Sequence, residues 1–251
     1  MSAAPHLQLV TDDRNDIEVS TILVRRFLDI PDDEPVEITV FYEGRVHIAH
    51  ATTVDAHIRL LGEAQRRRDY TAAFMLCNGP MDPALVDRYE PDQIHRAWNG
   101  RVTDKDIATR RALFIDVDAI RPKGISSTDD QLQEAYEVSA ALEAWLAAEV
   151  GEHAIGHGCS GNGFFTLIAL EAKPDGKDTP IKVGAFLQLL NKMFGTDRVK
   201  IDSSVSNLAR LMPAPGTWKR KGRNTEERPH RMTSFIFRAP VARIPREALI
   251  G

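Results

Sequence analysis

Residues 113–118, Leu-Phe-Ile-Asp-Val-Asp, restrict the fold more than any other part of the sequence. The run is apolar and of strand length, and side chains alternate between the two faces of a strand. Leu113, Ile115 and Val117 are therefore expected in the core, whereas Asp116 and Asp118 project together from the other face. The sequence predicts a strand with one covered face and one face that carries two neighbouring carboxylates.

This carboxylate pair indicates a metal site. Two like charges at adjacent same-side positions repel each other unless a cation lies between them, and Mg²⁺ or Mn²⁺ accepts such oxygen ligands. A third acid, Asp202, ends the short apolar run 199–202, so three carboxylates converge if the two strands are neighbours. Three carboxylates can hold two divalent ions. The alternatives are a strand end that meets solvent, for the pair, and a loop acid that caps the turn at Ser203, for Asp202.

The pattern of apolar residues predicts a mixed α/β fold. A small α/β lobe is expected from two strands, a helix, a third strand and a short helix, at residues 36–41, 45–49, 54–68, 71–77 and 84–89. A second lobe is expected from strands at 112–117, 164–170, 199–202 and 233–237, with helices between them. Its first helix follows a capping box formed by Thr128 and Gln131 and ends at Gly151, and its second begins at Thr179 and Pro180.

These elements define four expected segments: an acidic N-terminal segment, an N-terminal α/β lobe, a catalytic lobe and a C-terminal segment that begins a linker, at residues 1–35, 36–110, 111–240 and 241–251. The first segment carries eight acids against three arginines between residues 11 and 34. We interpret this charge run as a solvated surface.

Composition narrows the class of protein. The net charge is −4 and no apolar run approaches the ~20 residues that span a bilayer, so a cytoplasmic protein without a membrane partner is expected. Only two cysteines occur, Cys77 and Cys159, in no zinc-binding pattern. They are expected to be reduced thiols, and zinc is not expected.

Residues 156–161, Gly-His-Gly-Cys-Ser-Gly, match the G-x-G-x-x-G fingerprint of dinucleotide-binding proteins. That fingerprint requires a strand before it and a helix after it, whereas here the pattern predicts a helix before and a strand after. We therefore reject the dinucleotide interpretation. The glycines indicate either a turn whose backbone N–H groups approach a phosphate, with Ser160 as an added donor, or a plain flexible turn.

Residues 219–231 carry six Lys and Arg against two Glu, despite the negative net charge. Such a basic loop can hold a triphosphate or a template backbone, with Lys219, Lys221 and His230 among the candidate contacts. The alternative is a solvated loop. Trp218 precedes it, and for this residue we favour anchoring in the core over stacking on a base. The chain has no P-loop motif and is not itself a P-loop helicase.

In this order the motifs resemble those of the archaeo-eukaryotic primase (AEP) superfamily, and in particular the primase-polymerase (PrimPol) domains of plasmids, phages and mobile elements. The resemblance runs from about residue 78 to residue 240. Residues 114–118 with Arg121 are similar to the first motif, residues 160–163 to the second, and Ile201 and Asp202 to the third. Further matching positions follow at Asn207, Arg210, Gly216, Thr217, Lys221, Gly222 and residues 228–231.

The resemblance implies an N-terminal α/β lobe packed on a catalytic lobe of the RNA-recognition-motif (RRM) type, with the active site in the cleft between them. It implies a DNA primase or polymerase that transfers nucleotides on a template, with Mg²⁺ or Mn²⁺ ions held by Asp116, Asp118 and Asp202. The implied partners are single-stranded DNA template, a primer strand, nucleoside triphosphates and a helicase domain or partner. The implied nucleotide contacts are Ser160, Gly161, Asn162, Arg210, Lys219, Lys221 and His230.

One position departs from the family pattern. The second motif continues Ser-Gly-x-Gly-x-His in the family, and Phe165 stands where that histidine contacts the nucleotide phosphates. His157 and His230 are candidates to replace it in space. The departure leaves open a replication-initiation or nucleic-acid-binding module with weak or lost polymerase activity. A third function, a metal-dependent nuclease that uses the same carboxylates, is also open.

Overall fold

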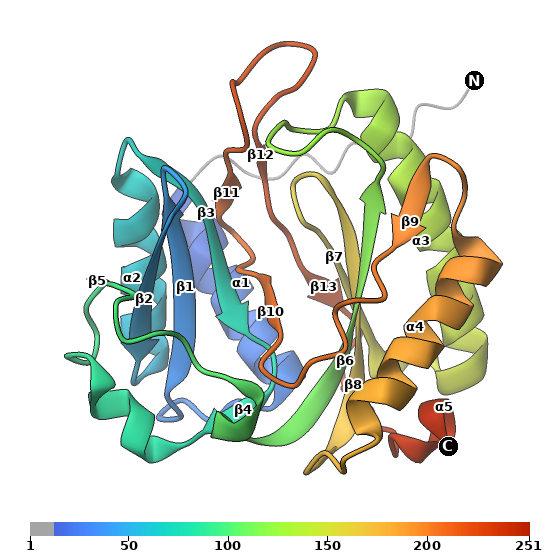
Figure 1. The fold of residues 1–251 in the computed structure, drawn as a ribbon, viewed down its shortest axis with the longest axis horizontal. Helices are drawn as coiled ribbons and strands as arrows, with labels where there is room; N and C mark the ends of the chain where they lie inside the picture. The colour runs from blue at the N-terminus through green and yellow to red at the C-terminus, as the bar shows by residue number, and fades with distance from the viewer. Residues whose placement is uncertain (1–12) are drawn as a thin grey trace.

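The protein consists of two β-sheets that face each other, with helices on their outer sides (Figure 1). The computed structural model describes residues 13–251. The first sheet has the strand order β10-β3-β1-β2-β5, and the second has the order β13-β7-β8-β6-β4 with β9 paired to β6. A short ribbon, β11-β12, lies between them. The mixed α/β class expected from the sequence is therefore confirmed.

The first sheet is built around a hairpin. Its strands are β1 (Val36–Tyr42), β2 (Arg45–Ala51), β3 (Tyr70–Leu76), β5 (His95–Arg96) and β10 (Leu211–Pro213). Glu43 and Gly44 link β1 to β2 with positive φ angles of 45° and 79°, the backbone geometry that matches the twist of a tight hairpin. Helix α2 (Val54–Arg66) follows, and Thr53 caps it by accepting a hydrogen bond from the Ala56 N–H at 3.1 Å.

Helix α1 (Asp13–Leu28) occupies much of the segment that we interpreted as a solvated acidic surface. Glu18, Asp29, Asp32 and Asp33 are exposed, as expected of a solvated acidic surface. The helix is nevertheless amphipathic, because Val24, Phe27 and Leu28 are fully buried and pack into the protein. The first twelve residues of the expected acidic segment lie outside the described part of the chain.

The second sheet contains the topology of an RRM-type domain. In chain order its central elements are β6 (Ile107–Ala119), α3 (Asp129–Val150), β7 (Ile155–Cys159), β8 (Gly163–Lys173), α4 (Thr179–Phe194) and β9 (Val199–Ile201). Their spatial order, β9-β6-β8-β7, is antiparallel throughout, which is the split β-α-β arrangement. Helices α3 and α4 cover one face (Figure 1), and the other face looks toward the first sheet.

Helix α3 begins and ends as its sequence predicts. Thr128 and Gln131 form the capping box, with bonds of 3.1 Å and 3.2 Å, and Gly151 ends the helix at a φ of 83°. The remaining elements are β4 (Gly79–Met81) and β13 (Ile236–Phe237) in the second sheet, the ribbon of β11 (Trp218–Lys219) and β12 (Arg231–Met232), the terminal helix α5 (Glu247–Ile250), and three short 3₁₀ turns at Pro83–Arg88, Asp104–Asp106 and Glu152–Ala154.

The chain passes between the two sheets more than once. Residues 36–110 supply β4 to the second sheet, and residues 111–240 supply β10 to the first, where it pairs with β3. Helix α1 also bridges them, because Ile17 packs in the core of the first sheet and Phe27 in that of the second. No helix among residues 13–251 has the length and apolar character that a membrane span requires.

Candidate active site

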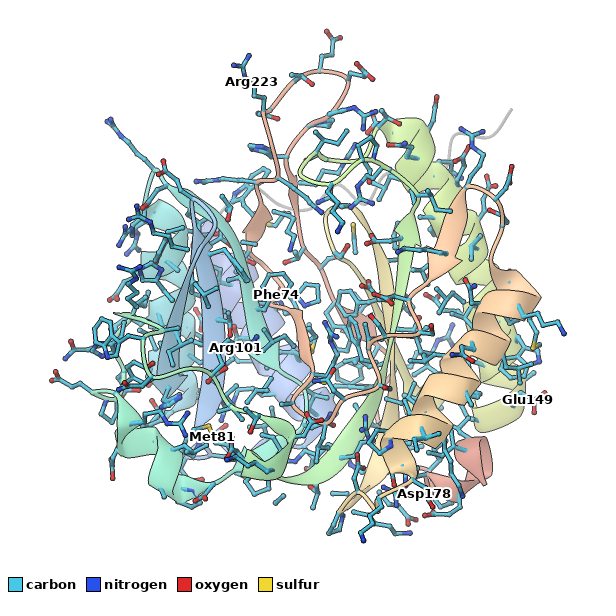
Figure 2. The ribbon with its side chains drawn as sticks, in the orientation of Figure 1. Phe74, Met81, Arg101, Glu149, Asp178 and Arg223 are labelled. Carbon is cyan, nitrogen blue, oxygen red and sulfur yellow. The ribbon has the colours of Figure 1, made fainter. Side chains whose placement is uncertain are left out.

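A cavity of about 180 Å³ lies between the two sheets. The first sheet contributes Phe74, Leu211 and Pro213, and Figure 2 shows Phe74 on β3 between the sheets. The second sheet and the loops around it contribute the polar side chains. These are Asp116, Asp118, Arg121, Ser160, Asn162, Arg210, Lys219 and Lys221, together with Phe114.

Strand β6 places the two carboxylates as its alternation predicts. Ile115 and Val117 are fully buried, whereas Asp116 and Asp118 are half-buried and line the cavity. Asp118 pairs with Gly163 of β8. A Cβ atom at position 163 would come within 2.5 Å of the Asp118 carboxylate, so glycine leaves the space that this carboxylate occupies.

The electrostatic environment of Asp116 and Asp118 disfavours their ionised forms. Burial raises the pKa of Asp116 to about 7, and the nearby Asp118 charge raises it further toward that value. Among the described residues, no hydrogen bond or ion pair to the Asp116 carboxylate is found. Asp118 has the Arg121 guanidinium at 3.5 Å. A buried acid beside a second acid, with little compensation, has the character of a site for a bound cation.

Asp202 lies beside the pair, but its carboxylate caps a turn and does not line the cavity. Strand β9 pairs with β6, and the Asp202 N–H donates to the Asp116 carbonyl at 2.9 Å. The carboxylate accepts a hydrogen bond from the Ser204 N–H at 2.9 Å, which is the turn cap of the alternative interpretation. Burial raises the pKa of Asp202, but the hydrogen bonds from Ser204 outweigh it and hold the pKa below its usual value. Residues 13–251 gather no group of three or more metal-binding side chains.

Four cationic side chains line the same cavity as the carboxylates: Arg121, Arg210, Lys219 and Lys221. The Lys219 ammonium lies 3.8 Å from the centre of the Phe74 ring. Burial lowers the pKa of Lys219 to about 7, and the neighbouring charge of Lys221 lowers it further. Arg121 is held by the Ala119 carbonyl at 2.9 Å, so its guanidinium is fixed at the end of β6.

The glycine-rich segment forms the hairpin between β7 and β8. A strand rather than a helix follows it, which excludes the dinucleotide fold, although β7 occupies residues that we expected in a turn. Gly161 turns the chain with a φ of 83°, and a Cβ there would approach the Lys219 Cβ to 2.6 Å. Asn162 accepts a hydrogen bond from the Ser127 N–H through Oδ1 at 2.9 Å. Its buried Nδ2 has no hydrogen-bond partner within the described range.

The basic loop 219–231 divides into two parts. Lys219 and Lys221 line the cavity, but Arg228 binds the Ser126 carbonyl at 2.8 Å and Arg231 binds the Ser127 carbonyl at 2.9 Å. These hydrogen bonds attach the loop to the segment that precedes α3. Arg223 lies near the outer end of the loop (Figure 2). Trp218 packs against the core of the first sheet, as favoured from the sequence.

The two histidines that were candidates to replace the family's histidine lie elsewhere. His230 is half-buried and bonds the Gly222 carbonyl at 2.9 Å, and it does not line the cavity. His157 pairs with Thr166 of β8, on the face that α3 covers, and lies 3.4 Å from Glu143 of that helix. Neither histidine reaches the carboxylates in this arrangement.

Phe165 is fully buried on the cleft side of β8, where it pairs with Asp116. Its ring stacks between Phe114 and Phe235, with centroid distances of 5.8 Å and 6.0 Å. Phe114 lines the cavity and Phe165 does not. The position is therefore part of an aromatic stack beneath the site.

Sequence reasoning did not select Arg121 and Phe74 as site residues. Arg121 follows the carboxylate strand directly, and that proximity is a usable signal. Phe74 belongs to a strand of the other lobe, and only the pairing of the sheets brings it to Lys219. For a divalent cation the residues fit in part: Asp116 and Asp118 form an oxygen pair, whereas the Asp202 carboxylate would have to leave Ser204.

The fold and the site together define an RRM-type sheet that carries paired carboxylates opposite a cluster of cations. The structure is similar to the AEP domain of the cyanophage S-2L primase-polymerase (PrimPol), with a TM-score of 0.49 and 11% sequence identity. The likeness covers 93% of this chain and 97% of that domain. No protein-family model and no curated protein matches the chain.

Proposed function

We propose that the protein is a template-directed nucleotidyltransferase of the primase-polymerase type. One observation carries the proposal: a carboxylate pair and four cations line one cavity between the sheets. Four positive and two negative side chains leave an excess of two positive charges, which suits a polyanion such as a triphosphate. The apolar wall of Phe74, Leu211 and Pro213 offers a surface for the less polar part of a nucleotide.

The roles of the residues follow from their positions. Lys219, Lys221 and Arg210 bind the phosphates, and the unpartnered amide of Asn162 adds a neutral donor. The hairpin turn at Ser160 and Gly161 brings backbone close to the same cavity. The 3′-hydroxyl of a primer attacks the α-phosphorus, and pyrophosphate leaves toward the cationic side. The proposed partners are single-stranded DNA template, a primer strand, nucleoside triphosphates and a helicase.

Asp116 and Asp118 are the proposed ligands of Mg²⁺ or Mn²⁺, with Asp202 as the third carboxylate after rotation away from Ser204. Divalent cations bound there would assist deprotonation of the attacking hydroxyl and offset charge on the departing phosphate oxygens. The raised pKa of Asp116 supports this role, because a carboxyl group that is costly to ionise alone gains from a nearby cation.

Primer extension tests the proposal. The protein is incubated with labelled deoxynucleotides or ribonucleotides, Mn²⁺ or Mg²⁺, and a primed or unprimed single-stranded template. Asp116→Asn and Asp118→Asn should reduce incorporation at least about 100-fold while circular dichroism stays unchanged. Asp197→Asn, an exposed loop acid, is the matched control. Incorporation that persists in both site variants would exclude this cavity as the active site, and shortening of the DNA would indicate a nuclease.

Phe165 favours a second candidate function. A buried phenylalanine stands where the family has a phosphate-binding histidine, so a nucleic-acid-binding module with weak or lost polymerase activity is the alternative. Such a module would bind primed DNA as tightly as a polymerase does. It would not extend the primer with any combination of metal and nucleotide. A filter-binding assay run beside the extension assay separates the two functions.

A further inference from the structure

The outer face of α4 carries an unbroken apolar ridge. Ile181, Ala185, Leu189 and Met193 recur at every fourth residue, so they lie in one row along the helix. Ile181 is 70% exposed, Leu189 50% and Met193 47%. Among the described residues, nine large hydrophobic side chains are exposed, and these are three of them. Their alignment on one helix is therefore a distinctive surface feature.

The ridge is separate from the face that holds α4 in the protein. Val183, Phe186, Leu187 and Leu190 are buried against the second sheet. Since that set already anchors the helix, packing within this chain does not require the outer row. The ridge also lies on the far side of the second sheet from the carboxylates, so a partner on α4 leaves the cleft open (Figure 1).

The charges beside the ridge have one sign. Helix α4 contains Lys182 and Lys192 and no acidic residue. At about 100° of rotation per residue, Lys182 lies on one side of the row near its start and Lys192 on the other side near its end. The Lys182 ammonium donates to the Gly251 carbonyl, and Lys192 is exposed without an ion-pair partner among the described residues. The outer face is therefore apolar along its centre and basic at its margins.

We propose that this face of α4 docks an amphipathic helix of another protein that carries an apolar row flanked by Asp or Glu. A row of every fourth residue is the ridge that fits the groove of a second helix, and acids beside it would meet the two lysines. A second copy of this chain is disfavoured, because pairing two α4 helices would bring lysines together. A membrane surface is disfavoured, because the row is one residue wide and contains no Trp, Tyr or Phe.

Two synthetic helical peptides test the proposal. Both carry the same leucine row at every fourth position, one flanked by Glu and the other by Lys, and binding is followed by fluorescence anisotropy. The Glu-flanked peptide should bind at least about tenfold more tightly than the Lys-flanked one. The double variant Ile181→Gln, Leu189→Gln should lose about tenfold in affinity, because the apolar contact is removed. Val19→Gln, at a 56% exposed position of α1, should leave binding unchanged.

Charge reversal adds a second readout. Lys192→Glu should weaken binding of the Glu-flanked peptide and strengthen binding of the Lys-flanked one. Damage to the fold would not produce such an opposite pair of changes. Equal binding by the parent and the double variant, or binding of neither peptide, overturns the proposal. A concentration-dependent dimer that the double variant abolishes would assign the ridge to self-association. Ridge-dependent binding to phosphatidylserine vesicles, without binding to the Glu-flanked peptide, would assign it to a membrane. Because none of these readouts involves nucleotides, they are independent of the proposed activity.

Discussion

Burial shifts the pKa values of Asp116 and Lys219 in opposite directions, so that the two values approach each other. Burial penalises the charged form of both groups, so the pKa of the acid rises to about 7 and that of the amine falls to about 7. Near neutral pH, each side chain is therefore divided between its charged and neutral forms. Small changes in pH or in bound charge should have large effects at this site.

Replacing the buried acid should change how stability depends on pH. The folded-state pKa of Asp116 lies above its ordinary value of 3.8. Between about pH 4 and pH 7, the native state therefore keeps a proton that the unfolded state has already released. Stability therefore falls as pH rises through this window. Asp116→Asn should remove that loss and exceed the parent by about 1–3 kcal/mol at pH 8, with no difference near pH 4. Urea denaturation in a chelator measures it, and parallel pH profiles would contradict the prediction.

Lys219 should make anion binding sensitive to pH. A lowered pKa means that the ammonium loses its proton as pH rises through about 7, so affinity for inorganic triphosphate should fall between pH 6 and 9. Lys219→Arg remains charged throughout, and its profile should be flatter by up to about tenfold at the alkaline end. Calorimetry without metal compares the two proteins. Any ionisation of the phosphate itself is common to both, so identical profiles would mean that Lys219 does not meet the anion.

Restoring the family's histidine should not improve this site. Phe165 is separated from the cavity by Phe114, and an imidazole in its place would lose ring stacking and be buried without an evident partner. Phe165→His should lower the free energy of unfolding by about 1–3 kcal/mol and leave the KM for nucleotide unchanged. A nucleotide titration and a urea denaturation together decide this. A clear fall in KM would show that the imidazole reaches the phosphates.

At the level of elements, local signals decided which parts could be predicted. The capping box at Thr128 predicted α3, and strict alternation at residues 115–118 predicted the two acids of β6 that line the cavity. Strand β7 escaped prediction because Gly156 and Gly158 interrupt its apolar pattern. Those glycines are required by neighbours that are distant in sequence, because a Cβ at Gly156 would overlap the Phe235 ring and one at Gly158 the Ser234 carbonyl. For Asp202, the turn cap was one of two alternatives, and the sequence alone could not decide between it and a cation site.

Helix α1 was not predicted because residues 11–34 were interpreted by their acidic charge, although the helix itself carries as many arginines as acids. Its last turn should contribute strongly to stability. The Phe27 ring is fully buried and lies 5.3 Å from that of Phe235 and 5.4 Å from that of Phe237. Phe27→Ala should lower the free energy of unfolding by about 3–5 kcal/mol, because it leaves a cavity in the second core. Val19→Ala, on the exposed side of the same helix, should cost less than about 1 kcal/mol. Similar losses in the two variants would mean that α1 does not depend on this contact.

Across the whole molecule, the two sheets should unfold together. Strand β10 belongs to the first sheet but follows the catalytic strands in sequence, and α1 packs in both cores. Trp218 reports on the first core and Trp145, on α3 beside Phe194, on the second. Variants that keep only one of these tryptophans should give coincident urea transitions by fluorescence. Two midpoints separated beyond error would show that the sheets are independent units.

The path of the chain between the sheets has a consequence for how such a gene can change. The polypeptide moves from one sheet to the other five times along β3, β4, β5, β6, β10 and β13. No single cut separates a segment that contains all strands of either sheet, so recombination cannot exchange one sheet for a foreign one. The two sheets are therefore expected to be inherited together. Insertions are tolerated only where both ends of the break stay in place, as at the exposed tip of loop 219–231.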